Sequence, residues 1–232
     1  MVDPRANPDA SQPARRTAPL IFGGAMLVII AVVAILIGTG GEDSDEGASG
    51  AIVCEPVPDD GGTEECPTEI VTEPADVLVS TSEGDFQISL DTEASPATTT
   101  SFRHLVEEGF YDGLSFQRVI PGFVIQGGDP NGDGSGGPGY YVDEEVPQST
   151  RYTPGVVAMA KGGTDPPGRS GSQFFVISGP GGQQLPPEYA YVGRVDSGME
   201  TVAAIDALGK PGSEEPSKPV TIESMTLVDP AE

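Results

Sequence analysis

The C-terminal two thirds of this 232-residue chain predict a mainly β domain in which antiparallel strands form a closed barrel with helices over its ends. Short apolar runs recur between turns that are rich in glycine and proline, and these runs indicate strands. Two amphipathic stretches, far apart in the sequence, indicate two helices. We therefore divide the chain into a tail at 1–19, an apolar segment at 20–37, a linker at 38–74 and the domain at 75–232.

The N-terminal segments predict a membrane anchor. Residues 1–19 are rich in proline, alanine and polar residues, which predicts a disordered cytoplasmic tail. The run from Leu20 to Ile37 carries no charge and is long enough to cross about 30 Å of hydrocarbon as a helix. Arginines precede this run and acids follow it, so we expect a single-pass protein of the cell membrane with its domain outside the cytoplasm. A cleaved signal peptide is the competing interpretation, but no small-x-small cleavage site follows the run.

The linker at 38–74 contains eleven acids and no lysine or arginine, together with many glycine, proline and serine residues. Such a composition repels itself and predicts an extended tether. Cys54 and Cys66 lie within it. On the outer side of a membrane they could close a small disulfide loop, and the alternative is two free or intermolecularly paired thiols.

The composition also argues against some classes of function. The formal net charge is −25, and a nucleic-acid-binding protein would need many more cations than this chain has. The cysteines and the single histidine lack the spacing of zinc ligands. Asp129, Asn131 and Asp133 match the start of a calcium-binding loop, but Tyr140 stands where the loop needs a bidentate glutamate. We expect no metal and no cofactor.

The domain begins with a predicted hairpin, in which residues 77–81 and 86–90 form strands around a turn at 83–85. Ser95 and Pro96 then provide an N-cap and a first helical residue for a helix that ends at Gly109. The remaining elements are strands at 155–160, 172–178, 191–195 and 220–228, and a helix at 197–208 that is capped by Gly209.

The stretch from Ser115 to Gly128, SFQRVIPGFVIQGG, places one cation, Arg118, among apolar residues of a strand. A structural arginine could extend its charge past its own stem into solvent. The alternative is a preorganised donor that faces a bound ligand, with Phe123 as an apolar wall and Gln126 as an orienting amide.

Three separated motifs decide between these alternatives. They are F-x-R-V-I-P-G-F-x-x-Q-G-G-D from Phe116, the later pair M-A at Met159, and G-S-Q-F-F from Gly171. The chain from about residue 75 to residue 230 resembles the cyclophilin family of peptidyl-prolyl cis-trans isomerases. The resemblance implies an eight-stranded antiparallel barrel capped by two helices and an enzyme that accelerates rotation about X-Pro bonds without a cofactor.

The resemblance also implies site residues. Arg118 is the implied catalytic residue. The implied substrate-binding residues are Phe123, Val124, Gln126, Ala160, Lys161, Gln173, Phe175, Leu185 and Tyr189. Gln184 stands where some members carry a tryptophan that binds cyclosporin, so the affinity for a cyclosporin-type inhibitor is left open.

Together with the predicted anchor, the resemblance implies that proline-containing polypeptides are the partners of the domain. The expected function is assistance to the folding of exported proteins at the outer face of the cytoplasmic membrane. The alternative is a catalytically weak binding module or chaperone that uses the same groove for one proline-containing partner.

Overall fold

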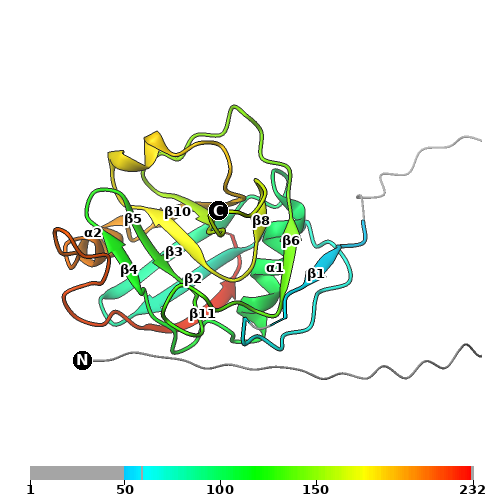
Figure 1. Cartoon of the computed structure of the whole chain (residues 1–232), viewed down its shortest axis with the longest axis horizontal. Coiled ribbons are helices and arrows are strands. Elements are labelled where there is room, and N and C mark those ends of the chain that lie inside the picture. Colours follow the sequence, from blue (N-terminus) through cyan, green and yellow to red (C-terminus); the bar gives the residue numbers. More distant parts are fainter. Residues whose placement is uncertain (1–49, 59, 231–232) are drawn as a thin grey trace, which may run out of the picture. The chain divides into compact units, whose positions relative to one another are not determined.

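The computed structural model describes residues 50–58 and 60–230. Its main element is an antiparallel sheet in the order β11-β2-β3-β10-β7-β9-β5-β4 (Figure 1). The strands are β2 (Asp76–Thr81), β3 (Gly84–Leu90), β4 (Arg118–Ile120), β5 (Val124–Gly127), β7 (Val156–Met159), β9 (Phe174–Ile177), β10 (Tyr191–Ser197) and β11 (Ile222–Val228). The predicted hairpin is the pair β2 and β3, in which Val79 pairs with Phe86.

The sheet curls into a half-barrel, so full closure of the predicted barrel is not observed. Its edge strands β4 and β11 are joined by an isolated bridge between Ser115 and Thr221 and not by a ladder. The reason lies at the outer edge of β4, where the backbone N–H of Val119 donates to the carbonyl oxygen of Glu214, 2.7 Å away. The loop before β11 therefore occupies the edge that a closing ladder would need.

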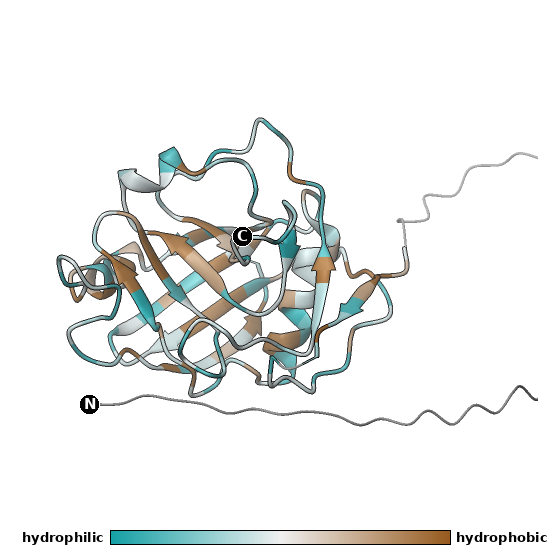
Figure 2. Ribbon diagram, viewed as in Figure 1, coloured by the Kyte–Doolittle hydropathy of each residue, from teal (hydrophilic) through white to brown (hydrophobic). Residues whose placement is uncertain are grey.

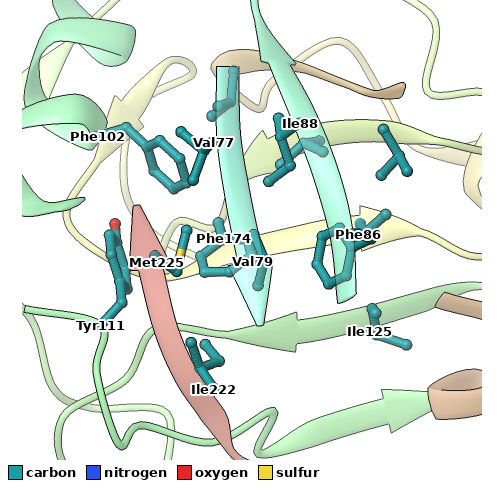
Figure 3. Packing of buried hydrophobic residues seen from close by; sticks show 14 of the residues in the cluster. Val77, Val79, Phe86, Ile88, Phe102, Tyr111, Ile125, Phe174, Ile222 and Met225 are labelled. Atoms are coloured by element: carbon teal, nitrogen blue, oxygen red, sulfur yellow. The ribbon is translucent and has the colours of Figure 1, made fainter. Parts of the chain in front are cut away.

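Two α-helices pack against this sheet, as predicted. They are α1 (Pro96–Glu107) and α2 (Met199–Asp206), and α1 buries Phe102, Leu105 and Val106. Figure 3 shows Phe102 among the side chains of the core, where its ring centroid lies 5.5 Å from that of Phe174. In Figure 2 hydrophobic stretches follow the strands of the sheet. Burial of these side chains is the main favourable term for folding.

The start of α1 differs in detail from the prediction. Ser95 precedes the helix but its side chain makes no capping hydrogen bond. The carboxylate of Glu144 instead accepts from the backbone N–H groups of Ala97 and Thr98, at 2.9 and 3.2 Å. A carboxylate satisfies free N–H groups at a helix N-terminus and interacts favourably with the helix dipole. The cap of α1 thus comes from a residue 46 to 47 positions away in the chain.

A second sheet, β1-β6-β8, was not predicted. It consists of β1 (Cys54–Pro56), β6 (Tyr140–Asp143) and β8 (Arg169–Ser170). Strand β1 comes from the part of the chain where the sequence predicts an extended tether. From residue 50 onward this part packs on the domain, because Ile52 is buried in a small cluster with Tyr140 and Val142. Its acids therefore do not keep it extended.

Cys54 and Cys66 form a disulfide, with their Cα atoms 6.2 Å apart. Of the alternatives that the sequence left open, the closed loop is the one observed. The predicted tail at 1–19, the apolar segment at 20–37 and the first part of the linker lie outside the described residues. Within 50–58 and 60–230, no helix has both the length and the apolar character that a membrane span requires.

Candidate active site

Strand register brings the predicted site residues onto one face of the sheet. Arg118 pairs with Gln126 across β4 and β5, and Gln126 pairs with Phe175 across β5 and β9. Directly paired residues of antiparallel strands point to the same side. Val124 lies two residues before Gln126 and shares that side, because side chains alternate along a strand.

Strand β9 shows why this face can hold a pocket. Its four residues are all buried, but they alternate between two hydrophobic clusters. Phe174 and Val176 belong to the main core, whereas Phe175 and Ile177 belong to a second cluster on the opposite face. The continuous apolar run in the sequence reflects burial on both faces of the strand.

A cavity of about 290 Å³ opens over this second cluster. Its walls are Arg118, Phe123, Val124, Gln126, Ala160, Lys161, Phe175, Leu185 and Tyr189. Gln173, the remaining residue implied by the resemblance, lines an adjacent hollow together with Gln126, Ala160 and Lys161. The structure thus brings together all ten residues from four separated parts of the chain.

A chain of side-chain amides orients Arg118. Its Nη1 donates to Oε1 of Gln126 at 3.2 Å, and Nε2 of Gln126 donates to Oε1 of Gln173 at 3.0 Å. Nε2 of Gln173 donates in turn to the carbonyl oxygens of Gly134 and Gly136, both at 3.0 Å. Because each amide has its donor and acceptor sides assigned by a neighbour, the orientation of every member is determined.

Asp129 organises the glycine-rich loop that ends this chain of amides. Its side chain is 1% exposed and accepts from the backbone N–H groups of Asn131 and Gly136, both at 2.9 Å, and of Gly134. These bonds supply a local physical reason for the acidic residue in this loop. Across residues 50–58 and 60–230, no group of three or more His, Cys, Asp or Glu side chains is placed to hold a metal ion.

Asp60, inside the disulfide loop, holds the other end of the same glycine-rich loop. Its Oδ2 accepts from the backbone N–H of Gly139 at 2.9 Å, and its carbonyl oxygen accepts from that of Gly137 at 3.3 Å. Asp60 also lines the hollow beside Gln173. The segment predicted to be a tether therefore contributes to the wall of the site.

Lys161 lines both the cavity and the adjacent hollow. Its side chain is only 6% exposed, and Nζ lies 3.4 Å from Oε2 of Glu188 and 5.8 Å from the ring centroid of Tyr189. Nζ also donates to the carbonyl oxygen of Asp165 at 3.1 Å. These partners compensate the charge of a largely buried ammonium group.

Sequence reasoning missed Tyr152, which supports the cavity from behind. Its hydroxyl donates to the carbonyl oxygen of Tyr189 at 2.7 Å and accepts from the backbone N–H of Tyr189 at 2.9 Å. Burial raises the pKa of Tyr152 to about 12. No motif surrounds this tyrosine, so its contact with Tyr189, 37 residues away, could not be read from the sequence.

Sequence reasoning also missed Glu214, which binds Arg118. Nε of Arg118 lies 3.0 Å from Oε2 of Glu214, and Nη2 lies 3.3 Å from Oε1. This bidentate contact lowers the pKa of Glu214, first through the hydrogen bond and then through the charge of Arg118. Glu214 lies in a polar loop beside a second glutamate, and the sequence does not indicate which of the two faces an arginine.

Residues 76–227 match the family described as cyclophilin type peptidyl-prolyl cis-trans isomerase/CLD. The chain belongs to the cyclophilin family. Peptidyl-prolyl cis-trans isomerase ppi1 of Schizosaccharomyces pombe is 39% identical over 152 residues, which cover 64% of this chain and 96% of that protein. Peptidyl-prolyl cis-trans isomerase A of Mycobacterium tuberculosis is 37% identical over 171 residues, which cover 66% of this chain and 92% of that protein.

A solved cyclophilin type peptidyl-prolyl cis-trans isomerase from Cryptosporidium parvum matches with a TM-score of 0.62 and 31% identity, over 68% of this chain and 99% of that one. The same protein in the presence of the dipeptide Ala-Pro matches with a TM-score of 0.61. The fold and the relatives agree with the motifs that carried the resemblance. This cyclophilin is a peptidyl-prolyl cis-trans isomerase.

Proposed function

We propose that Arg118 is the catalytic residue of this cyclophilin and that the enzyme assists the folding of exported proteins at the outer face of the cytoplasmic membrane. The observation that carries the catalytic assignment is the cavity over strands β5 and β9, where the guanidinium group of Arg118 lies beside the apolar side chains of Phe123, Val124, Phe175 and Leu185. Such a site suits a ligand that combines an apolar ring with a nearby polar group.

The reaction explains why an arginine is needed. The barrier to rotation about an X-Pro bond is about 18–20 kcal/mol because the nitrogen lone pair is conjugated with the carbonyl. In the twisted state the conjugation is broken and the prolyl nitrogen becomes basic. A donor that faces this nitrogen binds the twisted state better than the planar one, and only such differential binding accelerates the reaction. Arg118 is the donor in this proposal, and no proton transfer is required.

The remaining residues would hold the substrate. Phe123, Val124, Phe175 and Leu185 provide an apolar wall for the prolyl ring. Gln126 and Gln173 present amide groups beside it, through which they would hold the backbone next to the proline. Holding the prolyl ring in place would keep the X-Pro bond aligned with Arg118 while the other side of the bond rotates.

A peptide titration tests the placement of the substrate. We expect an Ala-Pro peptide to perturb the backbone amide NMR signals of Gln126, Ala160 and Phe175 in the full chain, and Phe175→Ala to weaken its binding. An Ala-Ala peptide of equal length is the matched control and should leave these signals in place. Perturbations confined to a different face of the domain would contradict the proposed site.

The proposed location of the enzyme at the membrane rests on the sequence of residues 20–37 and on the charges that flank this run. A disulfide in the domain is consistent with an oxidising compartment outside the cytoplasm. We expect the full chain to sediment with membranes in high salt and at alkaline pH and to be released by detergent. A variant that lacks residues 1–37 should stay in the supernatant, and release of the full chain by salt alone would contradict an anchor.

A further inference from the structure

We propose that Glu214 is a positioning residue for Arg118, which it holds in the orientation needed to meet the prolyl nitrogen. This inference rests on the catalytic role proposed above for Arg118. It concerns an acidic residue of the loop between α2 and β11, 96 positions from Arg118 in the chain.

The backbone of this loop is fixed at the site. The carbonyl oxygen of Glu214 accepts from the backbone N–H of Val119 at 2.7 Å, directly after Arg118 in strand β4. The base of the loop is closed by a bridge between Gly209 and Pro216. Glu214 is therefore attached to the same strand edge as the arginine that it binds, and its side chain starts from a defined position.

The contacts of Arg118 divide its donors into two groups. A guanidinium group has five N–H donors in a planar fork. Glu214 accepts from the single N–H on Nε and from one N–H on Nη2, and Gln126 accepts from one N–H on Nη1. Within the described part of the chain, one N–H on each terminal nitrogen is left for a ligand in the cavity. Glu214 and Gln126 thus hold the guanidinium from two sides.

Two effects of the carboxylate compete. Its charge offsets part of the field of Arg118, but its side chain is 64% exposed, and water screens such a charge strongly. Its geometry removes rotational freedom from a long side chain that is itself 30% exposed. Water screens the exposed charge but does not change the bidentate geometry. The orienting effect of Glu214 on Arg118 therefore outweighs the partial neutralisation of its charge. Glu214 is therefore expected to raise the rate and not to suppress it.

Adjacent residues allow a matched test on the full chain. Glu214→Ala should lower kcat about three- to tenfold and leave KM unchanged, because the arginine must then be ordered during the reaction. Glu214→Gln, which keeps one acceptor, should recover part of this loss. Glu215→Ala removes the same charge one residue away, where the side chain makes no ion pair among the described residues, and should match wild type.

The pH profile adds a readout that a merely structural role would not change. Protonation of Glu214 breaks the bidentate contact, and Arg118 lowers the pKa of this carboxyl. The rate of wild type should therefore fall toward that of Glu214→Ala only below the ordinary titration range of a glutamate, whereas the ratio of Glu214→Gln to Glu214→Ala should stay constant. The rate should be measured by NMR exchange between the cis and trans forms of an Ala-Pro peptide. This measurement needs no coupling protease, whose own activity would change at low pH.

The variant Arg118→Ala separates this inference from the role on which it rests. A full rate in Arg118→Ala would overturn the catalytic role itself. A slow Arg118→Ala beside an unchanged or faster Glu214→Ala would overturn the role of Glu214 alone. Equal losses in Glu214→Ala and Glu215→Ala would also overturn it, since they would indicate an effect of net charge. Urea unfolding midpoints close to that of wild type in all variants would show that the losses of rate arise at the site and not from unfolding.

Discussion

The hydroxyl of Tyr152 is a single polar group on which one wall of the candidate active site depends. It is hydrogen-bonded to both the N–H and the carbonyl oxygen of Tyr189, whose ring lines the cavity. The rings of Tyr152 and Tyr189 lie 5.8 Å apart, edge to face. Removal of the hydroxyl leaves two backbone groups without their partner in a largely buried place.

We expect Tyr152→Phe to lower the free energy of unfolding by about 1–3 kcal/mol, which is the usual cost of unsatisfied buried polar groups. It should also weaken peptide binding, because Tyr189 loses its support. Tyr141→Phe is the control, since no hydrogen bond of that hydroxyl is present in the described part of the chain. Urea unfolding and a peptide titration measure the two effects, and equal behaviour of both variants would contradict this role.

Tyr152 also predicts how the stability of the domain changes at alkaline pH. Burial raises the pKa of Tyr152 from 10.0 to about 12. A raised pKa means that the protonated form is favoured in the folded state, so its contribution to stability is full below pH 10 and is lost as the pH rises toward 12. The stability difference between wild type and Tyr152→Phe should therefore narrow over this interval in urea unfolding experiments. A difference that widened would contradict the assigned environment.

At the scale of elements, the disulfide loop connects an N-terminal segment to the site. Asp60 within the loop binds the glycine-rich loop at Gly137 and Gly139, and that loop binds Gln173 through Gly134 and Gly136. The order of contacts therefore runs from the disulfide to the amide chain that orients Arg118. The described residues between 50 and 74 thus pack on the domain and contact the candidate site.

Replacing both cysteines by serine should lower the free energy of unfolding by about 3 kcal/mol, because a loop with a sequence separation of 12 is no longer closed in the unfolded chain. The loss of kcat/KM should be smaller than that caused by Arg118→Ala. Wild type under dithiothreitol should behave like the double variant, and the double variant should not respond to the reductant. A stability unaffected by either change would contradict a structural role for the loop.

The sequence predicts the elements that depend on local pattern. The period-two runs at 77–81 and 86–90 and the helix after Pro96 are observed within a few residues of their predicted bounds. Strand β1 was missed because its partner β6 lies more than eighty residues away, and because the acids around it are typical of a solvated linker. Pairing between distant segments depends on tertiary contacts that no local pattern encodes.

The arrangement of the candidate site could be predicted only for residues that belong to the sequence motifs. The signature from Phe116 and the later G-S-Q-F-F place Arg118, Gln126 and Phe175 on paired strands, and the structure brings them to one cavity. Glu214 and Tyr152 were not predictable, because each acts through a contact with a residue far along the chain. Sequence motifs therefore do not predict the residues that orient the site, because their contacts become visible only once the fold is known.

At the scale of the whole molecule, an acidic protein places two of its few cations, Arg118 and Lys161, at the candidate active site. The chain has 11 lysines and arginines against 36 acids, and among the described residues Arg118 and Lys161 are the cations that line the cavity. The surrounding acids need not abolish the effect of Arg118, because charges more than about 10 Å away in water are screened at 0.1 M salt. The proposed role of Arg118 therefore depends on its local contacts with Gln126 and Glu214.

The most direct test of the account is the turnover of an Ala-Pro peptide by the full chain and by Arg118→Ala. We predict that kcat/KM falls about a hundredfold in the variant, which is the usual effect of losing one preorganised donor to a transition state. Arg151→Ala, which removes an exposed cation outside the cavity, should leave kcat/KM unchanged. An Arg118→Ala enzyme that is folded and turns over at the wild-type rate would contradict the central claim.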